Sequence, residues 1–163
     1  MLIETGYNRD AAVAYAQKWA FGRNPRYLDF EDLGGDCTNY ASQCIYAGCG
    51  VMNYTPVYGW FYDSASRRTA SWTGVEFLYK FLVGNRDVGP YATQTTLDQL
   101  EPGDLVQLGD AGGHFYHSPV VVSVAYGEIY VAAHTFDAWM RPLSSYQFAR
   151  SRPLHIMGAR KYG

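Results

Sequence analysis

One cysteine of this sequence stands where a thiol can act as a nucleophile. Cys37 follows two glycines and Asp36 in the stretch GGDCTNYASQC, residues 34–44. If Asp36 caps a helix that begins here, the Cys37 sulfur lies beside unpaired N–H groups and the positive end of the helix dipole, and both favour the thiolate. The Cys37 N–H then serves as half of an oxyanion hole. The charge of Asp36 opposes this effect, because a neighbouring negative charge raises the pKa of a thiol.

The alternative is that Cys37 is a buried, unreactive residue, which is a frequent fate of a free cysteine. This interpretation applies to Cys44, which falls mid-helix on the core side, and to Cys49, in the loop expected after it. Cys37 and Cys44 are about 10 Å apart along a helix, beyond the roughly 7 Å that a disulfide allows. The sequence contains no C-x2-C pair, so it predicts no zinc site. We expect no metal and no cofactor.

A cysteine nucleophile needs a base, and two histidines are placed to supply one and to orient it. His117 opens the segment HSPVVVSV, and His134 ends the strand that returns after Tyr126–Gly127. With the turn centred there, His134 faces Pro119, and the two histidines are diagonal neighbours about 7–8 Å apart at Cα. A one-residue shift of the turn sets Asp137 opposite His117 instead. Either His134 or Asp137 could therefore orient the base.

The other two histidines give weaker signals. His114 and His117 form an H-x-x-H spacing, but the segment is not helical, so we expect no metal site there. His155 has no polar partner nearby in the sequence, and we expect it to pack or to face water. Asp104 is expected to anchor the backbone where a strand begins.

The elements that must position these residues change from helix to strand along the chain. Caps, apolar spacing and glycine stops predict three helices, over residues 8–22, 37–47 and 73–84. Their caps are Asn8, Asp36 and a capping box from Thr73 to Glu76, and Gly48 follows the second helix. Loops are expected at 23–35 and 49–71, and strands at 105–108, 117–124, 128–134 and 154–160. This order predicts an α+β fold in one domain, residues 1–163.

Composition narrows the classes of partner. The chain has 163 residues, 48% hydrophobic and 17% charged, with a net charge of −2, so we expect neither a nucleic-acid nor a membrane partner. No apolar run approaches the roughly 20 residues of a membrane span. The N-terminal MLIETGYNRD shows no signal peptide. For a cell-wall enzyme, either a signal was removed or export is indirect; the alternative is a substrate inside the cell. Aromatic residues are abundant, with 15 Tyr, and many of these rings must lie at the surface or along a groove.

Several motifs together resemble a known family. After AVAYAQKWA and NPRY come DCTNYASQC at 36–44, SWTGVEF at 71–77, PGDLVQL at 102–108, HSPVVV at 117–122 and HTFDAWMRPL at 134–143. In this order they resemble the bacterial amidase-domain family, which is grouped with papain-like cysteine amidases and peptidases such as the NlpC-type and CHAP-type cell-wall hydrolases. The resemblance covers nearly the whole chain, and the first motif is the most specific. It implies a papain-like fold, with N-terminal helices packed on a C-terminal antiparallel sheet.

The resemblance also implies roles for individual residues. Cys37 matches the nucleophile and His117 the base, while His134 matches the third polar residue that holds the imidazole, with Asp137 as its substitute and Asp36 as a possible support. Tyr40 departs mildly from the family, which usually has Phe at that position.

Two polar positions of the second helix recur in the family. Asn39 and Gln43 match them, and we assign both to helix packing and loop anchoring, with a polar contact to substrate as the alternative.

The function expected from these residues is a cysteine-dependent amidohydrolase or peptidase that works through a thioester. Its substrate would be a peptide or a peptidoglycan stem peptide. The aromatic segment YTPVYGWFY at 54–62 and Trp139 could wall a groove for that substrate or simply cover the sheet. Two alternatives stay open: a binding module on the same fold that no longer cleaves, and a transferase in which an amine replaces water.

Overall fold

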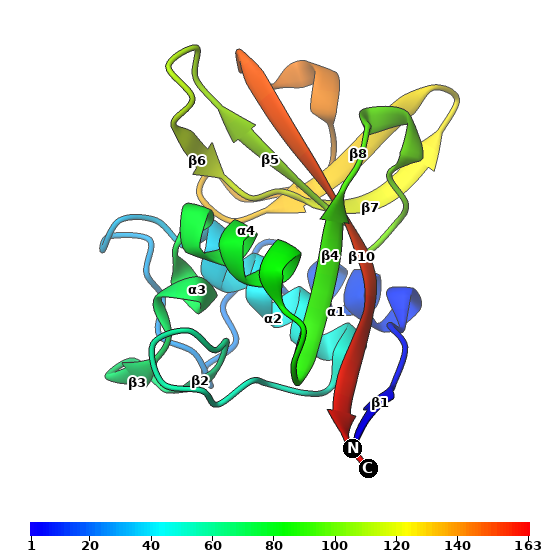
Figure 1. Ribbon diagram of the computed structural model, residues 1–163. Coiled ribbons are helices and arrows are strands. Elements are labelled where there is room, and N and C mark those ends of the chain that lie inside the picture. The colour runs from blue at the N-terminus through cyan, green and yellow to red at the C-terminus, as the bar shows by residue number, and fades with distance from the viewer.

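Helices occupy the first half of the chain and most strands the second, which confirms the predicted α+β class. The computed structural model describes residues 1–163 (Figure 1). The helices are α1 (Arg9–Trp19), α2 (Cys37–Cys49), α3 (Ala70–Thr73) and α4 (Val75–Gly84). Two short 3₁₀ turns, η1 (Leu97–Gln99) and η2 (Leu143–Ser145), lie between strands. None of the helices combines the length and the apolar character needed to cross a bilayer.

Eight strands form one antiparallel sheet. They are β1 (Leu2–Glu4), β4 (Gly89–Gln94), β5 (Leu105–Gly109), β6 (Phe115–His117), β7 (Val120–Ala125), β8 (Glu128–Ala133), β9 (Ala138–Pro142) and β10 (Arg150–Tyr162). The order is β1-β10-β5-β7-β8-β9, with β4 paired to β10 and β6 to β5. A separate hairpin joins β2 (Tyr62–Ser64) and β3 (Arg67–Arg68). In Figure 1, β10 runs the length of the molecule and ends beside β1, where both termini lie.

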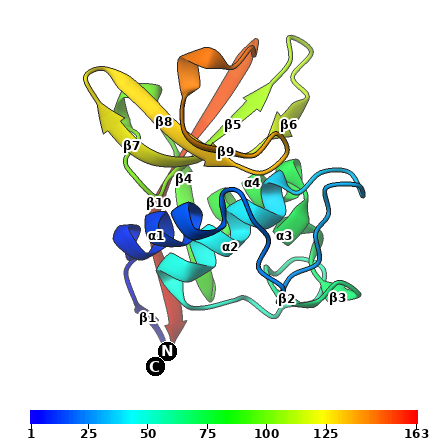
Figure 2. The same ribbon diagram turned by 180° about the vertical axis from the view of Figure 1, so that it is seen from behind.

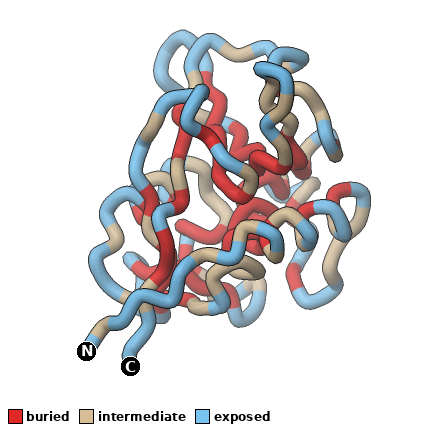
Figure 3. The backbone as a smooth tube through the Cα atoms, turned by 90° about the vertical axis from the view of Figure 1, so that its right-hand side faces the viewer, coloured by how far each residue is buried: buried red, intermediate tan, exposed pale blue.

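The main hydrophobic core lies between the helices and the sheet, around α2 (Figure 2). Tyr40, Cys44 and Ile45 of α2 are fully enclosed, and Trp72 packs on Trp60 with ring centroids 4.5 Å apart. Successive residues of β5 face opposite sides of the sheet, so a smaller core covers the other face. That core consists of Leu100, Val106, Leu108, Val121, Val131 and Leu143. Figure 3 shows the buried segments concentrated where the helices meet the sheet.

The helix ends differ in part from those predicted. Asn8 does cap α1, since its side chain accepts a hydrogen bond from the Ala11 N–H at 3.0 Å. The α2 helix continues past the predicted stop, so Cys49 belongs to the helix and not to a loop. It ends at Gly50, whose φ of 71° is left-handed and whose N–H bonds to the Tyr46 carbonyl.

The predicted capping box at the start of α4 is wrong. Thr73 is the last residue of α3, Gly74 occupies the cap position of α4, and no side chain bonds there. The carboxylate of Glu76 instead pairs with Arg152 of β10, 2.9 Å away, because that partner carries a charge and the cap does not.

The predicted hairpin forms at Tyr126–Gly127, but its register changes along the strands. Ala125 pairs with Glu128 as predicted, and then the ladder shifts by one residue between Val121 and Ser123. The predicted pairing of His134 with Pro119 is therefore not formed. The predicted strand 117–124 is also broken into β6 and β7, because Pro119 has no N–H to continue the ladder.

Gly48, near the end of α2, lies against the residues that precede α1, and its substitution tests this packing. The Gly48 carbonyl accepts the Asn8 N–H at 2.8 Å, and a Cβ at position 48 would contact the Tyr7 ring and lie 2.9 Å from the Asn8 carbonyl oxygen. We expect Gly48→Ala to lower the free energy of unfolding by about 1–3 kcal/mol. The control is Gly84→Ala, where the added Cβ meets nothing within 4 Å. Urea unfolding of both variants measures the difference, and equal stability would contradict the close approach.

Candidate active site

Cys37 begins α2, and the chain before it has the geometry that only glycine adopts easily. Gly34 and Gly35 both have φ of 105°. A Cβ on Gly35 would also lie 3.1 Å from the Thr135 hydroxyl, so the glycine lets this loop approach the turn after β8. The Asp36 N–H donates to the same hydroxyl at 3.1 Å. The start of α2 is thereby fixed against the sheet.

The Cys37 thiol is 7% exposed and lies against the junction of β6 and β7. Its sulfur is 3.7 Å from the Thr38 hydroxyl oxygen and 3.9 Å from the Tyr116 carbonyl oxygen. Burial raises the pKa of the Cys37 thiol; hydrogen-bond donors at Thr38 and Ser118 oppose that shift, and the charge of Asp36 adds to it. The thiol is consequently the resting form at neutral pH.

A groove of about 550 Å³ opens beside Cys37. Its walls are the start of α2, the start of α4 from Gly74 to Phe77, and residues 113–116 leading into β6. Neither the aromatic segment 54–62 nor Trp139 lines it; Trp60 and Tyr62 pack into the main core instead. Another hollow of about 470 Å³ lies beside β7 and β8, and none of the predicted site residues lines it.

His117 lies between Tyr116 and Ser118, which both contact the start of α2. The Tyr116 carbonyl faces the Cys37 sulfur, and the Ser118 hydroxyl faces the Thr38 hydroxyl. The His117 ring is buried against Tyr146, with centroids 5.7 Å apart, and it forms no hydrogen bond with the Cys37 sulfur. It pairs with Leu108 in the ladder between β5 and β6. Burial, and then the charge of Arg141, lower the pKa of His117 to about 4, so its imidazole is neutral at neutral pH.

His134 does not hold His117 in this structure. Its Nδ1 lies 2.5 Å from Asp36 Oδ2 and its Nε2 lies 2.7 Å from the Trp19 carbonyl oxygen. Its ring also stacks on Tyr40 with centroids 4.0 Å apart. Its Nε2 also lies 3.3 Å from Arg23 Nη1, so polar groups surround both ring nitrogens. His134 therefore joins the start of α2 to the end of α1.

The Asp36 carboxylate does not cap α2, although the residue occupies the cap position. Besides His134, it accepts the Phe30 N–H and the Asn39 side-chain amide, each at 2.9 Å. Because these three groups use the carboxylate oxygens, the first N–H groups of α2 have no side-chain cap. That leaves them open to an incoming oxygen atom.

The remaining polar candidates connect loops and helices outside the groove. Asn39 donates to the Leu28 carbonyl and accepts the Trp72 indole N–H, each at 3.0 Å. Gln43 accepts the Tyr15 hydroxyl at 2.5 Å. Neither of them lines the groove.

Asp137 forms a two-pronged ion pair with Arg23, at 2.9 and 3.1 Å, and forms no hydrogen bond with His117. The carboxylates of Asp29, Glu31 and Asp36 also surround this guanidinium. Arg23 therefore balances the acidic side chains next to His134.

Two groups differ from the prediction or were missed by it. His155 is wrong as an unpartnered residue, since its Nδ1 lies 2.9 Å from Asp104 Oδ2. Asp104 anchors backbone as predicted, accepting the Glu101 and Ile156 N–H groups at 2.9 Å.

Gln107 was not predicted as a site residue. It is a buried amide of β5 that bonds to Ser118, and the available signal was a polar residue at an inward position of PGDLVQL. No group of three or more His, Cys, Asp or Glu is arranged to hold a metal ion.

The fold and this groove define an α+β protein with a buried thiol at the start of its central helix. The family described as "Putative amidase domain" matches residues 6–157, and the chain belongs to that family. The chain is therefore an amidase-like domain.

Two relatives come from Bacillus subtilis (strain 168). The uncharacterized protein YhbB is 36% identical over 140 residues, which is 83% of this chain and 43% of YhbB. The uncharacterized protein YjcM is 26% identical over 138 residues, 80% of this chain and 31% of YjcM. The chain thus spans less than half of the length of either relative. No solved structure matches the sequence.

Removing the charge of Asp36 should separate stability from thiol acidity. We expect Asp36→Asn to lower the free energy of unfolding by about 2–3 kcal/mol, because His134, Asn39 and the Phe30 N–H lose a buried, charged hydrogen-bond acceptor. The same change should lower the pKa of Cys37, because a nearby negative charge is gone. Urea unfolding and the pH dependence of alkylation measure the two effects. The control is Asp137→Asn, a more exposed ion-pair partner that should cost less than about 1 kcal/mol; equal losses would show that the buried pair is unimportant.

The neutral, buried state of His117 predicts a pH dependence of stability. Its pKa in the folded protein, about 4, lies below the ordinary 6.5, so the unfolded chain binds the proton more tightly. The resulting stability is complete above pH 6.5 and is lost as the pH falls towards 4, by at most about 3 kcal/mol. His117→Gln should flatten that part of the curve. His114→Gln, at an exposed ring, should not, and identical curves for all three proteins would contradict the assignment.

Proposed function

We propose that this protein is a cysteine amidohydrolase of the papain-like class, with Cys37 as nucleophile and His117 as general base. The observation that carries the proposal is the position of Cys37 on the first turn of α2, at the wall of the groove and against the backbone of Tyr116. His117 is the next residue after that contact. The amidase-like family supports hydrolysis of an amide as the reaction.

The proposed reaction starts from a neutral pair. The pKa of Cys37 is raised and that of His117 is lowered, so the thiol proton moves to the imidazole as the sulfur attacks. The His117 ring packs on Tyr146, so it must turn towards Cys37 when substrate binds. Catalytic hydrogen bonds are often absent or long before substrate arrives, and a side-chain rotation of this kind is fast.

The bonds then change as follows. Cys37 Sγ bonds to the amide carbon, and the carbonyl oxygen becomes an oxyanion that accepts the Cys37 N–H. The imidazolium of His117 gives its proton to the leaving nitrogen, the C–N bond breaks, and a thioester remains. Water attacks the thioester with His117 as base, which releases the acid and restores the thiol. No step uses a metal or cofactor.

The groove is suited to an extended peptide. Glycines and backbone form much of its wall, and Phe77, Phe115 and Tyr116 add aromatic surface. The acidic side chain that lines it, Glu76, is paired with Arg152. The substrate class that we propose is therefore an extended peptide, of which a peptidoglycan stem peptide is one example.

A peptide- or cell-wall-binding module is the second candidate. The observation that favours it is the missing hydrogen bond between Cys37 and His117, whose ring faces Tyr146. A thiol-directed probe separates the candidates. Labelling of Cys37 that depends on His117 supports catalysis, whereas equal labelling of all three cysteines supports binding alone. A transferase would use the same thioester with an amine in place of water, and product analysis with added amine distinguishes it.

Replacement of the nucleophile gives the direct test. We expect Cys37→Ala to lower amide hydrolysis by a factor on the order of 10³ or more, with the fold intact, because no other group can form the thioester. Purified peptidoglycan and synthetic stem peptides serve as substrates, with mass analysis of the released fragments. Cys49→Ala, at the opposite end of α2, is the control and should stay active. Wild-type activity in the Cys37 variant rules out this mechanism.

A further inference from the structure

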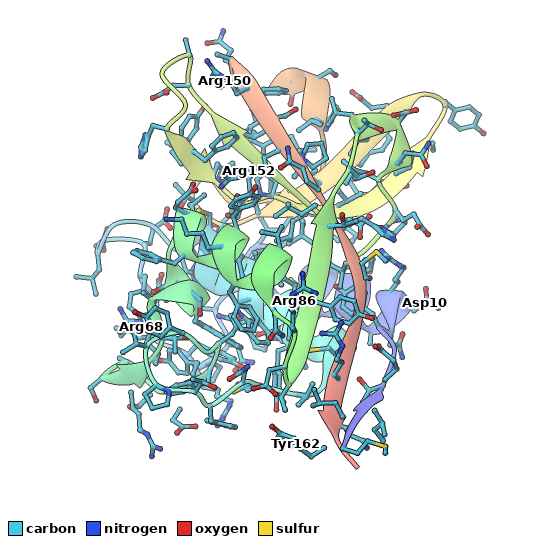
Figure 4. All side chains as sticks on the ribbon, in the orientation of Figure 1. Asp10, Arg68, Arg86, Arg150, Arg152 and Tyr162 are labelled. Carbon is cyan, nitrogen blue, oxygen red and sulfur yellow. The ribbon has the colours of Figure 1, made fainter.

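A line of buried polar side chains leads from β10 to the Cys37 sulfur. Figure 4 shows its first member, Arg152, on the upper half of β10. The others are Gln107 of β5, Ser118 between β6 and β7, and Thr38 of α2. Their exposed fractions are 7% for Arg152, 0% for Gln107 and Ser118, and 1% for Thr38. Buried polar groups of this kind must bond to one another, which makes their hydrogen positions deducible.

The direction of the chain is set at its Arg152 end. A guanidinium only donates, and Arg152 places Nε 3.0 Å and Nη2 2.5 Å from Gln107 Oε1. The amide oxygen of Gln107 must therefore face Arg152. Its Nε2 then faces the Val75 carbonyl at 3.0 Å and the Ser118 hydroxyl at 3.2 Å, and it donates to both. Glu76 fixes the far side of the guanidinium.

The two hydroxyl groups pass this direction on. Ser118 Oγ accepts from Gln107, and its other hydrogen-bond partner is Thr38 Oγ1, 3.1 Å away, so donation to Thr38 is the arrangement that also satisfies the Ser118 proton. Thr38 Oγ1 accepts that proton, so its hydrogen points to Cys37 Sγ, 3.7 Å away. The thiol proton has a separate acceptor in the Tyr116 carbonyl oxygen. Every donor group along the line thus has an acceptor, and the last donor faces the sulfur.

We propose that Thr38 is a positioning residue whose hydroxyl, oriented by Ser118, Gln107 and Arg152, donates a hydrogen bond to the Cys37 sulfur and stabilises its thiolate. An isolated hydroxyl could rotate and accept the thiol proton instead, which would favour the neutral form. The ordered chain disfavours that orientation, because it would leave the Ser118 proton without an acceptor. It offsets part of the cost of placing a thiolate in a buried site. The contribution of this hydrogen bond to catalysis rests on the proposed function, whereas its effect on the pKa of the Cys37 thiol does not.

The test measures the acidity of the Cys37 thiol without any substrate. Iodoacetamide alkylation is followed over a range of pH, and mass analysis of the peptide containing Cys37 separates it from Cys44 and Cys49. We expect Thr38→Val to raise the pKa of Cys37 by about one unit, equivalent to about tenfold slower alkylation near neutral pH, because one hydrogen bond to a charged sulfur is lost. Thr38→Ser restores the hydroxyl and should return the pKa to the wild-type value.

Two further variants distinguish orientation from packing. Ser118→Ala keeps the Thr38 hydroxyl but removes the group that orients it, and we expect a smaller rise in the pKa of Cys37. Ser42→Ala removes a buried hydroxyl of the same helix that bonds to Trp60 and to the Trp72 carbonyl and has no link to Cys37. It should affect stability and leave the pKa of Cys37 unchanged.

An unchanged pKa in Thr38→Val, or an equal rise in Thr38→Val and Ser42→Ala, overturns the proposal. If Thr38→Val shifts the pKa but the wild-type protein hydrolyses no amide, the hydrogen-bond chain stands and the proposed function fails. If the wild-type protein is an active amidase and Thr38→Val leaves the thiol unaffected, the reverse holds. In an active enzyme, Thr38→Val should also shift the pH profile of kcat/KM in the same direction as the alkylation profile.

Discussion

The buried carboxylate of Asp36 is the interaction on which the site depends. It receives hydrogen bonds from a loop N–H at Phe30, from the side chain of Asn39 and from His134. Through His134 it also reaches the carbonyl at the end of α1. Three separate segments of the chain are held at one point next to Cys37. These bonds act together with those of the Asp36 N–H to Thr135 and of Thr38 to Ser118, which also join the start of α2 to the sheet.

This use of Asp36 has a chemical consequence. Since its oxygens bond to groups other than the first backbone N–H groups of α2, the positive end of the helix is left to the Cys37 thiol and to an incoming carbonyl oxygen. The negative charge of Asp36 still disfavours the thiolate, and burial does the same. The guanidinium of Arg23, with its Nε 3.7 Å from Asp36 Oδ2, offsets the charge of the carboxylate at close range. The electrostatics of the thiol therefore come from opposing contributions of neighbouring groups.

The features that the sequence predicted are local ones. The Asn8 cap, the Tyr126–Gly127 turn and the order of helices before strands each depend on residues a few positions apart, where rules of spacing apply. The partner of Asp36 could not be found this way, because 98 residues separate it from His134. The register shift beside Val122 in β7 was also invisible, although it decides which residues face each other. The family resemblance drew attention to Cys37 and His117, whose roles stay a prediction, but not to the buried amide of Gln107 that links Ser118 to Arg152.

The long strand β10 also has a consequence for how the protein forms. It supplies pairing partners for β1, β4 and β5, and β1 meets it across almost the entire chain. During synthesis from the N-terminus, Cys37 leaves the ribosome more than a hundred residues before Arg150–Tyr162 is available. Pairings of such long range form late and slow the folding of a domain. The nascent thiol therefore stays without its finished surroundings until the last strand inserts, so that assembly of the sheet and maturation of the site are a single event.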